Sequence, residues 1–274
     1  MSECTNNYYI YNGNIKESEN FDEKILSKGT ALYEVIRIID GKPLFFKKHM
    51  ARLKNSAKIT NVTIKFTDEE IKQSIDKLID INKVCNGNVK LIFNFEVNLD
   101  KLNVFAVYFV RHSYPSKEEY MFGVSTIFYR AERDNPNAKV LNTGFRELVN
   151  KEIGDKHAFE AILLDRNGDI TEGSKSNIFM VKGDKVITAP IEAVLPGTTR
   201  QTIIEICNKL NIQVVEKKIN CTQVKDLDAL FISGTSPKVL PISKVDKIEF
   251  KSPQNEIVLK IMRAYDEEMN NDLA

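Results

Sequence analysis

Residues His157 to Thr188 read HAFEAILLDRNGDITEGSKSNIFMVKGDKVIT, and they indicate the class of fold. Their apolar runs have the length and the β-branched content of strands. Two dipeptides, Asn167-Gly168 and Gly183-Asp184, separate these runs and are typical of the tight turns that join antiparallel strands. The segment therefore predicts antiparallel hairpins, with strands at His157–Asp165, Asp169–Val181 and Lys185–Thr188.

The rest of the second half adds helices and further strands to these hairpins. The patterns predict strands at Met121–Tyr129, Ile212–Glu216 and Ala229–Ser233, helices at Phe145–Ile153 and Thr199–Leu210, and a final helix capped by Ser252. This half is therefore expected to be β-rich with flanking helices.

The first half begins with a β-meander. Tyr8–Tyr11 is strand-like and turns at Asn12-Gly13, and Ala31–Ile39 turns at Asp40-Gly41 toward Pro43–Phe45.

Two helices and two strands follow the meander. Helical spacing of apolar residues indicates a helix over Lys47–Ile59, and Thr67 with Glu70 three residues later indicates the start of a second helix. Strands are expected at Val89–Val97 and Asn103–Val110. The β-β-α-α-β-β order predicts an α+β domain rather than a doubly wound sheet.

A polar, proline-containing segment divides the two halves. Residues 114–119 lie between two strand candidates and include Pro115. We therefore predict a small N-terminal α+β domain at residues 1–113, a linker at 114–119 and a larger domain at 120–274.

Composition excludes several classes of protein. Among the 274 residues, 39 lysines and arginines face 38 acidic residues, so there is no global field for nucleic acid or an anionic membrane. Four cysteines and three histidines show no metal-ligand or disulfide spacing, which predicts no metal site. The N-terminal residues lack the pattern of a signal peptide, and the longest apolar run is too short for a membrane span. We expect a cytoplasmic protein.

Two turns have the composition of anion sites. Leu195-Pro196-Gly197-Thr198-Thr199-Arg200 opens a helix, where free backbone N–H groups and two hydroxyls suit a phosphate. Phe231–Pro237 is a strand that ends in small hydroxyl residues. Base rates favour an ordinary capped helix for the first and a plain turn for the second.

Two charged residues are candidates for chemistry. Glu172 interrupts a hairpin strand among small polar residues, where a carboxylate could bind a cationic ring nitrogen, although base rates favour a solvated bulge. Lys139 lies before a short apolar step, but it is one of thirty lysines, and an amine becomes a nucleophile only when its surroundings lower its pKa. His49, by its residue type alone, is more often packed or solvated than catalytic.

Seven segments share their order and spacing with one known family. They are Tyr33-Glu34, His49-x-x-Arg52-Leu53, Lys139-x-Leu141-Asn142, Glu160–Leu163, Thr171–Asn177, Leu195–Arg200 and Ser233–Thr235. Together they resemble the class IV pyridoxal-phosphate aminotransferases, which include branched-chain and D-amino acid aminotransferases and aminodeoxychorismate lyase. The Glu-Gly-Ser-x-Ser-Asn stretch followed by the Gly-x-Thr-Arg turn is the most specific part.

The resemblance implies a role for each matching residue. Lys139 would hold pyridoxal 5'-phosphate covalently and move the substrate proton, and Glu172 would keep the ring nitrogen protonated. The resemblance assigns further cofactor contacts to Arg52, Ser176, Asn177, Leu195, Gly197, Thr198, Thr199, Gly234 and Thr235, and substrate contacts to Tyr33, Thr235 and Ser236.

The resemblance also implies a fold and a reaction. The expected architecture is an α+β chain of two domains, with a barrel-like larger domain, the cofactor in the cleft between the domains, and a homodimer. The expected activity is transfer of an amino group between a branched-chain-like amino acid and a 2-oxo acid. The alternatives are 4-amino-4-deoxychorismate lyase activity, which releases pyruvate and 4-aminobenzoate, and a non-catalytic binding protein.

Two departures concern specificity. D-amino acid aminotransferases carry an Arg-Gly pair after the third strand, whereas this chain reads Phe93-Asn94-Phe95-Glu96-Val97-Asn98. Branched-chain enzymes place a tyrosine shortly after the lysine, whereas this chain has Asn142-Thr143-Gly144-Phe145. The sequence leaves open the amino donor, its handedness, and whether Tyr33 or the Thr235-Ser236 backbone binds the substrate carboxylate.

Overall fold

The computed structural model describes residues 2–26, 29–96, 102–133 and 135–274, and it divides the chain into two compact units. The smaller unit comprises residues 1–113, 138–141 and 271–274, and the larger unit comprises residues 114–137 and 142–270.

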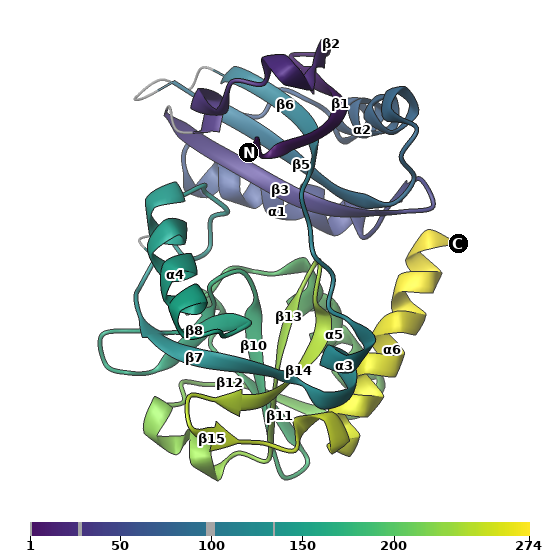
Figure 1. The fold of residues 1–274 in the computed structure, drawn as a ribbon. Coiled ribbons are helices and arrows are strands. Elements are labelled where there is room, and N and C mark those ends of the chain that lie inside the picture. Colours follow the sequence, from purple (N-terminus) through teal and green to yellow (C-terminus); the bar gives the residue numbers. More distant parts are fainter. Residues whose placement is uncertain (1, 27–28, 97–101, 134) are drawn as a thin grey trace. The chain divides into compact units, whose positions relative to one another are not determined.

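The smaller unit contains a six-stranded antiparallel sheet (Figure 1). Its strands are β1 (Cys4–Tyr11), β2 (Asn14–Glu17), β3 (Thr30–Ile39), β4 (Lys42–Pro43), β5 (Gly87–Phe95) and β6 (Leu102–Val110), in the order β2-β1-β6-β5-β3-β4. The Asn12-Gly13 turn joins β1 to β2, as predicted, and both of its residues have positive φ. The predicted strand end at Val97, and Asn98, lie outside the described residues.

Two helices pack against this sheet. They are α1 (Phe46–Ile59) and α2 (Asp68–Asn82), and α2 begins at the predicted capping box, in which Glu70 N donates to Thr67 Oγ1. The core between helices and sheet includes Leu53, Ile75 and Phe93, all at most 1% exposed. The predicted β4 strand at Pro43–Phe45 is shorter, because Phe45 is already the N-cap of α1.

The larger unit is built on a nine-stranded sheet. Its strands are β7 (Val124–Arg130), β8 (Glu160–Leu164), β9 (Ile170–Gly173), β10 (Asn177–Lys182), β11 (Lys185–Thr188), β12 (Gln213–Glu216), β13 (Ala229–Gly234), β14 (Lys238–Val245) and β15 (Ile248–Glu249). The hairpins β8–β9 and β10–β11 are antiparallel, as predicted, but the single strand predicted at Asp169–Val181 is two strands, β9 and β10, separated by residues 174–176. The sheet is nevertheless mixed, because β11–β12, β7–β14 and β7–β8 are parallel pairs. A turn signal identifies hairpins, whereas parallel pairs join strands distant in sequence.

The larger unit also contains the helices α3 (Lys117–Phe122), α4 (Thr143–Asp155), α5 (Thr198–Lys209) and α6 (Glu256–Leu273), except that the residues of α6 from Asn271 onward belong to the smaller unit. The strand predicted at Met121–Tyr129 forms as β7, but its predicted start was wrong, because Ser116 and Glu119 form a capping box that starts α3, and the strand begins only at Val124. The predicted cap of the last helix was also wrong. Ser252 lies in a 3-10 turn and its Oγ accepts from Leu230 N, while Asn255 Oδ1 accepts the N–H groups that begin α6.

The domain boundaries stay a prediction, and two observations bear on them. The chain changes unit between Ser113 and Tyr114, whereas the segment predicted as a linker, 114–119, contains the start of α3. Residues Ala138–Leu141 belong to the smaller unit although they fall within the predicted larger domain. None of the described helices combines the length and the apolar character that a membrane span requires.

Candidate functional site

A buried carboxylate organises the break between β9 and β10. Glu160 is 4% exposed and accepts hydrogen bonds from Ser174 Oγ at 2.6 Å, Ser176 Oγ at 3.1 Å and Lys175 N at 3.2 Å. These bonds fix the three-residue loop Ser174–Ser176 and satisfy a charge that burial would otherwise penalise. The predicted cofactor residue Ser176 therefore has its hydroxyl bound to Glu160.

Glu172 lies at the end of β9 and is 3% exposed, so the solvated bulge is excluded. Its Oε2 accepts from Leu195 N at 3.1 Å and from Asn177 Nδ2 at 3.4 Å. Asn177 Nδ2 also donates to Leu195 O at 2.9 Å. The structure thus brings together three predicted residues, Glu172, Asn177 and Leu195. The two neutral donors on Oε2 orient the Glu172 carboxylate.

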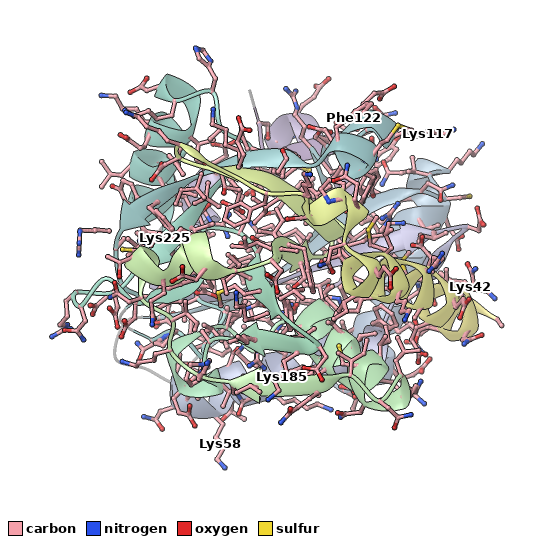
Figure 2. All side chains as sticks on the ribbon, turned by 90° about the horizontal axis from the view of Figure 1, so that it is seen from below. Lys42, Lys58, Lys117, Phe122, Lys185 and Lys225 are labelled. Carbon is pink, nitrogen blue, oxygen red and sulfur yellow. The ribbon has the colours of Figure 1, made fainter. Side chains whose placement is uncertain are left out.

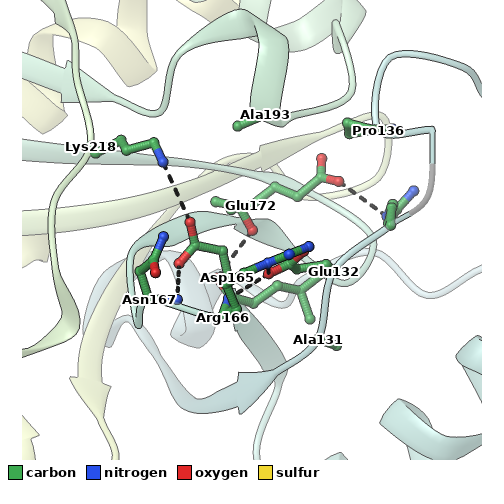
Figure 3. Close-up of a pocket in the computed structure, with 12 residues that line it drawn as sticks. Ala131, Glu132, Pro136, Asp165, Arg166, Asn167, Glu172, Ala193 and Lys218 are labelled. Carbon is green, nitrogen blue, oxygen red and sulfur yellow. Dashed lines mark hydrogen bonds and ion pairs between the residues drawn. The ribbon is translucent and has the colours of Figure 1, made fainter.

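The other carboxylate oxygen of Glu172 faces an arginine. Arg133 Nε lies 3.1 Å from Glu172 Oε1, and Arg133 Nη2 donates to Ser174 O at 2.8 Å. Both side chains line a cavity of about 260 Å³, in which Arg166 pairs with Glu132 and Lys218 with Asp165 (Figure 3). Arg133 and Glu172 thus form an ion pair at the wall of this cavity.

The predicted anion turn leads into α5. Gly197 is the N-cap residue and provides no side-chain cap, while Thr198 and Thr199 in the first turn are each 3% exposed. A Cβ atom at Gly197 would collide with Asn177 Oδ1, so only glycine permits this approach. An uncapped helix start with its positive dipole end is a site for an anion. Arg200, which ends the motif, donates to Glu216 at 2.8 Å.

The second predicted turn follows β13. Gly234 is the last residue of this strand, and Thr235 and Ser236 are half-buried in the turn toward β14. β13 pairs with β10 so that Ser233 lies directly opposite Asn177. The strand pairing therefore places the Ser-Gly-Thr segment beside the Glu-Gly-Ser-x-Ser-Asn segment.

In the smaller unit, the segment that contains Lys139 lies beside β3. Tyr33 N donates to Lys139 O at 3.1 Å, and Lys139 N donates to Ser56 Oγ at 3.0 Å. Lys139 Nζ lies 4.4 Å from the centroid of the Tyr33 ring, which is a cation–π distance. The half-buried Lys139 contrasts with exposed lysines such as Lys58 and Lys185, which point outward (Figure 2).

Arg52 belongs to a buried charge cluster that we name the Glu34 cluster, comprising Glu34, His49 and Arg52. Arg52 Nε donates to Glu34 Oε1 at 2.8 Å and Arg52 Nη2 to Glu34 Oε2 at 2.5 Å, while His49 Nδ1 lies 2.7 Å from Oε2. All three side chains are at most 6% exposed. The predicted phosphate ligand Arg52 therefore donates to Glu34 through two of its nitrogens, Nε and Nη2. Its third nitrogen, Nη1, takes no part in these two hydrogen bonds.

The Glu34 cluster has a defined charge state. Burial alone would raise the pKa of the Glu34 carboxyl, but the charge and hydrogen bonds of Arg52, aided by His49, lower it to about 2. Burial, together with the nearby charges of Arg52 and Lys139, lowers the pKa of His49 against the opposing effect of Glu34. Glu34 is thus ionised and His49 neutral at pH 7.

Sequence reasoning missed two residues that contact predicted ones. Glu34 belongs to the Tyr33-Glu34 motif, and no motif contains Arg133. The scarcity of arginine is the signal that was present, because nine arginines occur among 39 basic residues. Which arginine reaches Glu172 depends on the packing of the loop after β7 and could not be read from spacing.

Comparison with known families identifies the chain. The model of the family "Amino-transferase class IV" matches residues 31–245, and the chain belongs to this family. Members of the family are pyridoxal-phosphate enzymes, and this protein is a class IV transaminase. The family resemblance and the α+β fold expected from the sequence are confirmed.

Two curated relatives cover most of the chain. A D-alanine aminotransferase of Bacillus licheniformis is 27% identical over 86% of this chain and 88% of its own length. A branched-chain-amino-acid aminotransferase of Escherichia coli is 28% identical over 88% of this chain and 86% of its own length.

Solved structures share the fold. The branched-chain amino acid aminotransferase of Escherichia coli superposes with a TM-score of 0.85 at 24% identity, covering 98% of this chain and 96% of that one. The branched-chain aminotransferase of the archaeon Thermoproteus uzoniensis, solved with norvaline, superposes with a TM-score of 0.84 at 23% identity, again covering 98% of this chain and 96% of that one.

Proposed function

We propose that this protein binds pyridoxal 5'-phosphate and transfers an amino group between a branched-chain-like amino acid and a 2-oxo acid. The observation that carries the proposal is the geometry of Glu172, which is buried, oriented by Leu195 N and Asn177, and faced by Arg133. An ionised acid held in a buried site is what a protonated ring nitrogen requires as its partner.

The residues of the larger unit fit the cofactor. The uncapped start of α5 offers N–H groups to a phosphate, and Thr198 and Thr199 are buried there. Ser233 Oγ is buried without a hydrogen-bond partner among the described residues, as expected of a group that meets a ligand. These observations support binding of a phosphorylated molecule beside Glu172.

When bound, pyridoxal phosphate supplies an electron sink for the electron pair released at the substrate Cα. We assign Lys139 as its covalent anchor and as the base whose Nζ moves a proton between the substrate Cα and the cofactor C4′. Glu172 keeps the ring nitrogen protonated. The remaining residues position the group: Arg52, Thr198, Thr199 and Thr235 at the phosphate, Leu195 against the ring face, and Ser176, Asn177, Gly197 and Gly234 as the frame around them.

The substrate assignment rests on β5. D-amino acid aminotransferases carry an Arg-Gly pair after the third strand for the substrate carboxylate, whereas this chain reads Phe93-Asn94-Phe95-Glu96-Val97-Asn98 there, and Phe93 and Phe95 are fully buried in the core of the smaller unit. Phe95 offers no donor to a carboxylate. We therefore assign the carboxylate to Tyr33, Thr235 and Ser236, and we favour a branched-chain-like donor, in keeping with the Escherichia coli relative.

A half-reaction tests the proposal. Branched-chain amino acids, added to the holoenzyme without a 2-oxo acid, should convert the absorption spectrum of the bound aldehyde into that of the amine form. A D-alanine arm tests the handedness that the Bacillus licheniformis relative raises. A panel of amino acids with no spectral change would contradict transaminase activity.

Two further outcomes distinguish the alternatives. Pyruvate released from aminodeoxychorismate without a 2-oxo acid acceptor would indicate the lyase. A folded protein that stays colourless after incubation with pyridoxal phosphate would indicate a non-catalytic protein. Borohydride reduction followed by peptide mapping should label Lys139, and a label on another lysine would overturn that assignment.

The proposed assembly follows from the family resemblance, and the proposed location follows from the composition and the N-terminal residues. We propose a homodimer in the cytoplasm. Light scattering of the purified holoenzyme should give twice the chain mass of 31.3 kDa. A mass of one chain would contradict the dimer.

A further inference from the structure

The hydroxyl of Ser233 is a buried polar group of the larger unit. The residue is 1% exposed, and Ser233 Oγ has no hydrogen-bond partner among the described residues. Leaving a buried hydroxyl unsatisfied is destabilising, so such groups commonly face a ligand. Thr188, another buried hydroxyl of the same sheet, shows the usual arrangement, because its Oγ1 donates to Ile178 O at 2.8 Å.

Strand pairing shows which way Ser233 points. Directly opposite residues of an antiparallel pair place their side chains on one face, and Ser233 lies opposite Asn177. Their neighbours Ile178 and Ile232 belong to the core of the other face. Phe179 and Phe231, the next pair on the Ser233 face, stack with their ring centroids 5.0 Å apart. Ser233 therefore shares its face with the Asn177 side chain.

The same face leads to the start of α5. Asn177 Nδ2 donates to Leu195 O at 2.9 Å, and Asn177 Oδ1 fills the space beside the Gly197 backbone. The N–H groups of the first turn of α5 follow directly. A phosphate has several acceptor oxygens and a negative charge, so it matches a hydroxyl donor that lies near a helix N-terminus.

We propose that Ser233 is a further cofactor-binding residue, whose hydroxyl donates a hydrogen bond to the phosphate of the cofactor. The inference rests on the proposed function and deepens it. It explains why a serine without an internal partner among the described residues precedes Gly234 and Thr235, the residues already assigned to the phosphate and its frame.

The test compares two ligands on two variants of the apo-protein. Ser233→Ala should weaken pyridoxal 5'-phosphate binding about tenfold, the effect of about 1.4 kcal/mol for one lost hydrogen bond to a charged group. Its affinity for pyridoxal, which lacks the phosphate, should stay unchanged. Thr188→Val is the matched control, because its hydroxyl is bound within the protein, and it should change neither affinity. Absorption or fluorescence titration measures all of these constants.

Stability gives a second readout that does not depend on the cofactor. Ser233→Ala should leave the free energy of unfolding of the apo-protein unchanged or raised, because it removes an unsatisfied group. An equal loss of affinity for both ligands would mean that the hydroxyl contacts the ring and not the phosphate. No loss for either ligand would mean that the hydroxyl contacts neither the ring nor the phosphate. Both outcomes overturn the inference. If the wild-type protein binds no pyridoxal phosphate, the proposed function fails instead.

Discussion

Two buried carboxylates, Glu34 in the smaller unit and Glu172 in the larger one, differ in how they are satisfied. Both oxygens of Glu34 are bound by Arg52, with His49 on one of them. Glu172 has neutral donors on one oxygen, while the other faces Arg133 beside a cavity. The Glu34 carboxylate fixes the position of an arginine, whereas the Glu172 carboxylate is held by neutral donors on one oxygen and by Arg133 on the other, at the wall of a cavity.

Removing the charge of Glu172 is the most direct test of the difference between the two carboxylates. We expect Glu172→Gln to lower kcat by about 10²- to 10³-fold, the usual loss when one electrostatic contact to the reacting group is removed. Cofactor affinity should change much less, because the phosphate contacts remain. Single-turnover kinetics and cofactor titration measure the two effects. Glu132→Gln, which alters another acid of the same cavity, should retain activity; equal losses in both variants would contradict the role of Glu172.

Removing the charge of Glu34 should affect stability. Glu34→Gln leaves the Arg52 guanidinium buried without its ionic partner, so we expect the free energy of unfolding to fall by about 3–5 kcal/mol. Urea denaturation of the apo-protein measures the change. Asp76→Asn, which removes an exposed pair with Lys72, is the control and should have little effect. A loss confined to the control would show that the Glu34 cluster is not a stabilising unit.

The pH dependence of stability separates the members of the Glu34 cluster. The lowered pKa of Glu34 means that its contribution is complete above the unfolded value of 4.5 and is lost as the pH falls toward 2. The pKa of His49 is also lowered, so its burial as a neutral ring costs stability progressively once the pH falls below 6.5. The unfolding midpoint, measured from pH 8 to pH 3, should therefore decline in two separate pH ranges, one below pH 6.5 and one below pH 4.5. His49→Gln should remove the upper decline and keep the lower one; an unchanged profile would contradict a buried neutral His49.

The smallest expected effect concerns Arg133. Arg133→Gln removes the charge beside Glu172 but leaves Leu195 N and Asn177 in place, so we expect kcat to fall about tenfold with KM little changed. Arg133→Lys should recover part of the loss. Arg166→Gln removes an exposed arginine of the same cavity and serves as the control. If Arg133→Gln keeps full activity, the neutral donors alone orient Glu172.

The sequence was sufficient for the hairpins of the larger unit and for the family. Hairpins were predictable because Asn167-Gly168 and Gly183-Asp184 act within a few residues. The strand β14 escaped prediction because Pro241 lies within it. It is tolerated there because the pairing with β7 begins only at Ile242.

The candidate site shows the same difference between local motifs, which were predictable, and contacts that depend on packing, which were not. Glu172, Asn177, Leu195 and Gly197 were predictable as motif positions, and their mutual contacts followed in the structure. The partnership of Arg133 with Glu172 was not, because it depends on how the loop after β7 packs. The roles assigned to Lys139 and Arg52 stay predictions, to be tested by the trapping and binding experiments.

The close approach of Gly197 to Asn177 has a consequence for protein engineering. The two motifs come from separate stretches of the chain and pack directly against each other. Asn177 Oδ1 occupies the space that a side chain at position 197 would need. A residue other than glycine at position 197 would displace the Asn177 side chain and disturb the hydrogen bond that Asn177 Nδ2 donates to Glu172. Loop exchange in this enzyme should therefore transplant residues 171–177 and 195–200 together.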